Sequence, residues 1–151
     1  MRRILVSLIL GALCCSAQAA PLPYDESANA NADLQHALAA AQASHNDVLV
    51  VFGANWCPDC RELDKALKGR SQQLIAGKFQ VVKVDVGRFD KNLDVANEYG
   101  NPIRMGIPAV VVLTADNKIV YSSKGGELAN ARKMGDTGIY DFLSSHVAPA
   151  H

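Results

Sequence analysis

The chain has 151 residues, a length typical of one domain, and an ordinary globular composition with 49% hydrophobic and 20% charged residues. Lysine plus arginine and aspartate plus glutamate number 15 each, so the formal net charge is zero and gives no electrostatic reason to expect a nucleic-acid partner. No apolar run reaches the roughly 18 residues that would predict a membrane-spanning helix.

The first 19 residues have the pattern of a secretory signal peptide. Arg2 and Arg3 form a positive start, residues 4–15 form a short apolar region, and Ala17 and Ala19 are small residues at the positions that a signal peptidase reads. The alternative is an uncleaved membrane anchor, for which the apolar region is short. We predict cleavage after Ala19 and export of the mature chain.

Cleavage at this point changes the cysteine content of the protein. Cys14 and Cys15 would leave with the signal peptide, and only Cys57 and Cys60 would remain. A scaffold stapled by several disulfides is therefore excluded by count. Each remaining thiol can pair only with the other one or with a different molecule.

The mature chain begins with a lead-in and a helix. The prolines within residues 20–26 predict an extended conformation, and good helix formers predict a helix from Ser27 to about His45. Apolar residues repeat along this helix at helical spacing at Leu34, Ala37, Leu38 and Ala41. We divide the mature chain into a lead-in at 20–29 and one domain at 30–148.

The remaining elements predict a fold of the α/β class. The run from Val48 to Phe52 is continuously apolar and β-branched, which is typical of a strand buried on both faces. The later elements, in chain order, are a helix from Pro58 that breaks near Gly69 and resumes over 72–76, a strand at 79–86, a short helix at 92–99, a hairpin of strands at 109–114 and 118–122, and a helix from Thr137 to Val147. A right-handed parallel crossover and a terminal hairpin then give a mixed central sheet of about four strands with helices on both faces.

The segment Trp56-Cys57-Pro58-Asp59-Cys60 carries the chemistry. It places two thiols two residues apart at the expected start of a helix. The helix dipole and the free backbone amides there favour a thiolate, which is the species that attacks disulfides. The spacing therefore predicts thiol–disulfide exchange, with Cys57 better placed as the nucleophile than Cys60, which lies a turn inside the helix.

Three other roles for the cysteine pair stay open at this point. A structural zinc site needs four ligands, and no histidine is spaced as a pair with the two cysteines. A passive disulfide would close so short a loop that it would stabilise the fold little. A copper- or zinc-handling protein could use the same two thiols without catalysis.

The apolar strand at 48–52, the two-cysteine motif and Gly106-Ile107-Pro108 before a later strand together resemble the thioredoxin superfamily over roughly residues 30–148. The chain is most similar to exported thioredoxin-like proteins and to the C-terminal domain of periplasmic thiol–disulfide interchange reductases. This resemblance implies a thioredoxin-like fold, Cys57 as nucleophile and Cys60 as resolving thiol.

The resemblance also implies where a partner chain binds. Pro108 would be a cis proline packed beside the cysteines, and it would shape a groove for the partner together with Ile107. Trp56 and Pro58 would border the same groove from the motif side. The expected substrates are therefore protein disulfides or dithiols.

One departure from the usual thioredoxin pattern bears on proton transfer. Val51 stands where many thioredoxins carry a buried aspartate, six residues before the first cysteine. Asp64 lies four residues after Cys60 on the same helical face, and we hypothesise that it accepts the Cys60 proton instead. The alternative for Asp64 is a surface pair with Lys68. Lys83 interrupts an apolar strand, either behind the active site or at a sheet edge with its stem buried.

We thus expect an exported, periplasmic thiol–disulfide oxidoreductase that reduces or relays disulfides of partner proteins. Its only redox group would be the Cys57–Cys60 pair, with no bound cofactor or metal and with electrons from a membrane reductase or another thiol protein. A monomer suffices for this chemistry. The alternatives are a disulfide-forming oxidant of the same fold and a non-enzymatic copper- or zinc-handling protein.

Overall fold

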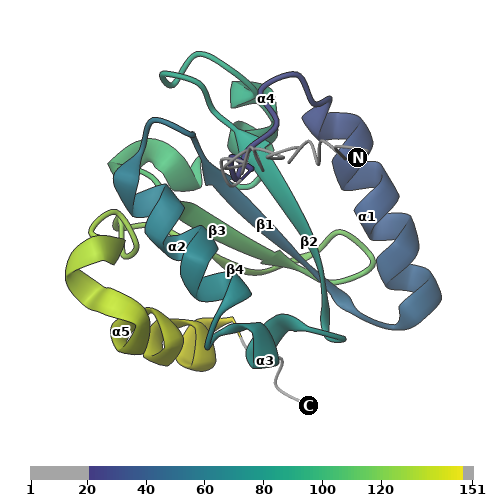
Figure 1. Ribbon diagram of the computed structural model, residues 1–151. Helices are drawn as coiled ribbons and strands as arrows, with labels where there is room; N and C mark the ends of the chain where they lie inside the picture. The colour runs from purple at the N-terminus through teal and green to yellow at the C-terminus, as the bar shows by residue number, and fades with distance from the viewer. Residues whose placement is uncertain (1–20, 148–151) are drawn as a thin grey trace, which may run out of the picture.

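A four-stranded mixed sheet forms the centre of the computed structural model, which describes residues 21–147 (Figure 1). The strands are β1 (Asp47–Gly53), β2 (Phe79–Asp85), β3 (Ala109–Leu113) and β4 (Ile119–Ser122), in the spatial order β2-β1-β3-β4. β1 pairs in parallel with β2, and the β1–β3 and β3–β4 pairs are antiparallel. The predicted parallel crossover and terminal hairpin are confirmed, while the predicted signal peptide and its cleavage site lie outside the described residues.

Helices cover both faces of this sheet (Figure 1). The helices are α1 (Ala30–Ser44), α2 (Pro58–Lys68), α3 (Gln72–Ile75), α4 (Leu93–Glu98), the 3-10 helix η1 (Pro102–Met105) and α5 (Ala131–His146). α1 packs on one face through Leu34, Leu38 and Ala41, and α2 and α5 pack on the other through Leu63, Ile139 and Leu143 among others. None of the helices between residues 21 and 147 is long and apolar enough to cross a membrane.

The central strand β1 explains why the fold has two apolar layers. Every residue from Val48 to Gly53 is buried, as the continuous apolar run predicts. Side chains alternate along a strand, so Val48, Val50 and Phe52 enter the core under α1, and Leu49 and Val51 enter the core under α2 and α5.

Two helices start at other residues than the sequence predicts. α1 begins at Ala30 rather than Ser27, because the Asp25 carboxylate draws the Ser27 N–H into a turn and Asn29 caps the helix by accepting the Ala32 N–H. α5 begins at Ala131 rather than Thr137. A turn of helix precedes Gly135, whose φ of 64° and ψ of 179° kink the backbone before the helix continues.

Candidate active site

Cys57 occupies the N-cap of α2, directly after the loop that follows β1. Its backbone is extended, with φ of −80° and ψ of 114°, and Pro58 follows in the first helical turn, where a missing N–H costs nothing. The Cys57 Sγ accepts a hydrogen bond from the Cys60 N–H at 3.2 Å. The predicted start of the helix and the placement of a sulfur at its free amides are confirmed.

This geometry changes the acidity of Cys57. The hydrogen bond from the Cys60 thiol lowers the pKa of Cys57 to about 7, against the opposing effect of burial, and the N–H groups of Cys60 and Asp59 lower it further. The negative charge of Asp59 works in the other direction. Close to neutral pH, therefore, Cys57 exists as both thiol and thiolate.

Cys60 lies in a different environment, although the two sulfurs belong to one turn. Its interaction with Cys57 and its burial both raise its pKa well above the usual value of a thiol. Cys60 is wholly buried and Cys57 is 4% exposed, so the expected order of exposure is confirmed and both side chains are largely covered. Both cysteines are free thiols in this structure.

The loop before β3 packs against the Cys57 sulfur. The Ile107–Pro108 peptide bond is cis, as predicted, and both residues are buried. The carbonyl oxygen of Ile107 lies 3.7 Å from the Cys57 Sγ and can accept the hydrogen bond of its thiol form. The residues that the sequence places 50 positions apart are thus neighbours at one end of the sheet.

Exposed aromatic side chains border the cysteines. Trp56 is 47% exposed, and its indole N–H donates to the Gly87 carbonyl at 2.7 Å, which fixes the ring over the loop after β2. Phe89, which is 43% exposed, meets the Trp56 ring edge-on at a centroid separation of 6.4 Å. Pro58, which the sequence also assigns to this surface, is partly exposed.

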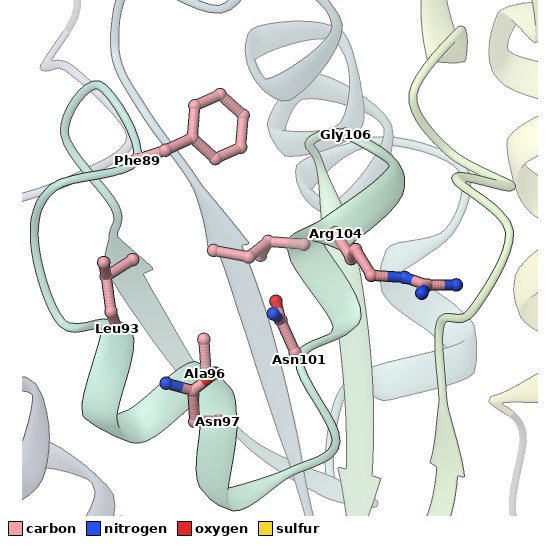
Figure 2. Close-up of a pocket in the computed structure, with 8 residues that line it drawn as sticks. Phe89, Leu93, Ala96, Asn97, Asn101, Arg104 and Gly106 are labelled. Atoms are coloured by element: carbon pink, nitrogen blue, oxygen red, sulfur yellow. The ribbon is translucent and has the colours of Figure 1, made fainter.

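A pocket of about 570 Å³ continues this apolar surface (Figure 2). Phe89 and Leu93 lie on one side of it, and Asn101 and Arg104 of the η1 segment lie on the other. It ends at Gly106, next to the cis peptide. Sequence reasoning did not find this pocket, because the η1 turn that forms one wall has no strong local pattern.

Asp64 lies between two lysines rather than one. Its carboxylate accepts hydrogen bonds from Lys68 at 2.8 Å and from Lys83, whose strand position is paired with Val51. Burial acts to raise the pKa of Asp64, but the two ammonium groups outweigh it and hold that pKa below its usual value. The surface pair with Lys68 and the placement of Lys83 behind the motif are therefore both present.

Asp59 is tied to the start of α5. Its carboxylate accepts hydrogen bonds from the backbone N–H of Arg132 at 2.9 Å and from the Arg132 side chain at 3.3 Å. Burial acts to raise the pKa of Asp59, and the Arg132 contacts lower it to below its usual value. The helix turn before Gly135 thus contacts the cysteine motif.

The lead-in contributes a residue that sequence reasoning missed. Tyr24 is 3% exposed and packs into the core beside both cysteines. Asn55 holds it there, because its amide oxygen accepts the Tyr24 N–H at 3.0 Å and its amide nitrogen donates to the Tyr24 carbonyl at 2.8 Å. The only signal in the sequence is a large aromatic residue directly after two closely spaced prolines, which does not indicate what it packs against.

Comparisons with known proteins point in one direction. The model of a family described as thioredoxin-like matches residues 29–115. Thioredoxin of Bacillus subtilis is 35% identical over 85 residues, which are 56% of this chain and 74% of that protein.

Solved structures extend the similarity over most of the described residues. The crystal structure of a disulphide isomerase from Xylella fastidiosa is 57% identical with a TM-score of 0.80, and the match covers 84% of this chain and 98% of the other. The oxidised C-terminal domain of DsbD from Neisseria meningitidis is 20% identical with a TM-score of 0.50, covering 79% and 97% of the two chains, which shows a shared fold.

Proposed function

Since this chain belongs to the thioredoxin-like family, we propose that it reduces or relays disulfides of partner proteins, with Cys57 as the attacking thiol and Cys60 as the resolving thiol. It is a thiol–disulfide oxidoreductase with a thioredoxin-like fold and a Cys57/Cys60 pair. The observation that carries the proposal is that the site shifts the pKa values of the two thiols in opposite directions. Within a single helical turn, the pKa of Cys57 is lowered and that of Cys60 is raised.

The proposed reaction has two steps. The Cys57 thiolate attacks one sulfur of the partner disulfide, the partner S–S bond breaks, and a mixed disulfide forms as the other partner sulfur leaves and takes a proton. Cys60 then loses its proton and attacks the Cys57 sulfur. The partner leaves with both of its cysteines reduced, and the enzyme holds the Cys57–Cys60 disulfide until a dithiol donor reduces it again.

The surface around Cys57 suits an unfolded or loosely structured partner segment. Trp56, Phe89 and Met105 expose large apolar areas beside the motif, and the pocket of about 570 Å³ that ends at Gly106 has the volume to take a bulky apolar side chain (Figure 2). Apolar patches rimmed by polar groups commonly mark protein-binding surfaces. This supports a polypeptide partner whose cysteine reaches Cys57.

The place of action that we propose is the periplasm. It rests on the signal-peptide pattern of the first 19 residues, with cleavage after Ala19. The electron donor would then be a membrane reductase or another exported thiol protein. Mass spectrometry of the mature N-terminus, with fractionation of the producing cells, tests both points.

Trapping tests the proposed partners. Cys60→Ser should hold partner proteins as mixed disulfides through Cys57, because the second step is blocked, and mass spectrometry should identify the bound cysteines. Cys57→Ser is the matched control and should trap far less. Equal yields from the two variants would show that Cys57 is not the attacking thiol.

The direction of exchange follows from the redox potential. A potential near that of thioredoxin, about −270 mV, would support a reductant, and one near about −120 mV would support a disulfide-forming oxidant instead. Equilibration of the Cys57–Cys60 pair with defined glutathione mixtures measures it.

A second candidate function is disulfide isomerisation, which the 57% identity to a protein named a disulphide isomerase favours. Isomerisation needs only the attack by Cys57, since a freed thiol of the substrate can then attack the mixed disulfide. This releases Cys57 and forms a new substrate disulfide without net oxidation. Cys60→Ser should therefore keep most of the activity on a protein with scrambled disulfides if isomerisation is the function. If Cys60→Ser instead loses both the isomerase activity and the reductase activity, reduction of partner disulfides is the favoured function.

Asp64 is part of the proposal as an acceptor of the Cys60 proton. Support comes from its place one helical turn after Cys60 and from Lys83, which lies in the sheet beside the position of the missing aspartate at Val51. Asp64→Asn should slow the second step, while Lys68→Ala, which removes only a 61% exposed partner, should not. Unchanged single-turnover kinetics in Asp64→Asn would refute the role.

A further inference from the structure

Tyr24 brings a hydroxyl group to the resolving cysteine. Glycine at position 53 leaves the space that this ring occupies: a Cβ placed there would collide with the Tyr24 hydroxyl oxygen and would lie 2.9 Å from the Cys60 Sγ. The hydroxyl oxygen and the sulfur therefore both lie within 2.9 Å of one point in the buried core. The known chemistry of the cysteine pair does not use this hydroxyl.

The lead-in is held firmly enough to fix the ring. Asn55 is 8% exposed and bonds both the N–H and the carbonyl of Tyr24, at 3.0 and 2.8 Å. The same amide nitrogen donates to the Glu26 carboxylate at 3.0 Å, and the Lys91 ammonium donates to the Glu26 carbonyl at 3.3 Å. The residue that anchors Tyr24 thus belongs to the loop that carries Cys57.

The surroundings of the hydroxyl keep it protonated. Burial raises the pKa of Tyr24 well above its usual value, and Cys60 and Cys57 at the start of α2, Asp64 on α2 and Asp85 on β2 raise it further. Asp64 is paired with Lys68 and Lys83, and Asp85 lies 3.4 Å from Lys91. Over the working pH range Tyr24 is therefore a neutral hydrogen-bond donor with negative groups around it.

We propose that the Tyr24 hydroxyl donates a hydrogen bond to the Cys60 sulfur as that sulfur becomes a thiolate, and so promotes resolution of the mixed disulfide. In this step the Cys60 S–H gives its proton to the acceptor proposed above, the Asp64 carboxylate, the new thiolate accepts a hydrogen bond from the Tyr24 O–H, and its electron pair attacks the Cys57 sulfur. The Cys57–partner bond breaks, and the partner leaves as a thiolate. The Cys60 thiolate otherwise forms in an apolar site, where a lone charge is costly.

The inference rests on the proposed exchange reaction, and one experiment separates the two. Reduced protein reacts in a stopped-flow instrument with excess nitrobenzoate disulfide, whose thiolate product is coloured. The first release reports attack by Cys57, and the second reports resolution by Cys60. If wild-type protein gives neither release, the proposed function fails. If it gives both, the comparison with Tyr24→Phe decides the inference.

Tyr24→Phe removes one oxygen and keeps the ring. We expect an unchanged first release and a second release slowed by roughly tenfold, at the lower end of what a hydrogen bond to a charged group contributes. The rate–pH curve of the second release should move to higher pH by about one unit, because a tenfold loss at the thiolate corresponds to one pKa unit.

Tyr99→Phe is the matched control. Tyr99 is 2% exposed, and its hydroxyl bonds Asn117 at 2.9 Å on another part of the molecule. Its removal should leave both releases unchanged, and melting curves of the two variants report any loss of stability. Equal rates for Tyr24→Phe and wild type, or equal slowing of both releases in Tyr24→Phe, would overturn the proposal.

Discussion

The acidity of Cys57 gives the sharpest test of the site geometry. With a pKa of about 7, roughly half of the Cys57 population is thiolate at neutral pH, whereas an unperturbed thiol with the ordinary value of 9.0 would be about 1% thiolate. The gain in thiolate is therefore about 50-fold. The hydrogen bond from the Cys60 thiol is the largest cause, so Cys60→Ala should raise the Cys57 pKa.

The gain in rate is much smaller than the gain in thiolate. Intrinsic nucleophilicity falls with pKa at a Brønsted slope of about 0.4–0.5, so a thiolate whose pKa is lower by about two units is roughly eightfold less reactive. The net advantage at neutral pH is then only about sixfold. A single rate measured at one pH is consequently a poor test, and the pH at half-maximal reactivity is a good one.

The assay is alkylation of the reduced protein by iodoacetamide between about pH 5 and 10, with the label at Cys57 quantified by mass spectrometry. We expect a midpoint near pH 7 in the wild-type protein and a higher midpoint in Cys60→Ala. Cys60 should be labelled slowly throughout, since it is wholly buried and its pKa is raised. A wild-type midpoint near that of an ordinary cysteine, or an unchanged midpoint in Cys60→Ala, would refute the reasoning.

Two further substitutions test the surroundings of the pair. Asp59→Asn should lower the alkylation midpoint of Cys57 by less than about one unit, because the Asp59 charge opposes the thiolate and the helix amides stay in place; a rise would contradict this. Gly53→Ala should lower the free energy of unfolding in urea by about 1–3 kcal/mol, since its Cβ has no room beside the Tyr24 ring. Gly125→Ala, where the nearest atom would be 3.8 Å away, is the control and should be nearly neutral; equal stability of the two variants would contradict the packing argument.

The parts of the site that sequence predicts are those set by local chemistry. The apolar run of β1 predicts a central strand, and the proline after Cys57 predicts the start of α2 at the first thiol. The Ile107-Pro108 pair is recognised through the family resemblance, and the cis bond is then found. In each case a few consecutive residues carry the information.

The parts that sequence does not predict depend on contacts between distant segments. Tyr24 is buried because Gly53, 29 positions later, leaves a space, and neither residue signals the other. Asp64 meets Lys83 because the register of β1 and β2 sets that lysine beside Val51, and no local pattern fixes a register between two strands buried under a helix. The start of α1 at Ala30 rather than Ser27 has a different, local origin, since side-chain bonds of Asp25 and Asn29 to nearby backbone N–H groups decide where the helix begins.

The order of the two steps of exchange follows from one local arrangement. A hydrogen bond between the thiols favours charge on Cys57 and disfavours it on Cys60, so one interaction lowers one pKa and raises the other. Once Cys57 is bound to a partner it no longer carries that charge, and the penalty on Cys60 falls. What remains is chiefly the cost of burying a thiolate, to which the negative charge of Asp59 adds. A neutral donor beside the Cys60 sulfur stabilises the charge at this stage and leaves the acidity of Cys57 to the Cys60 thiol and the helix amides, so its loss should affect the second step and spare the first.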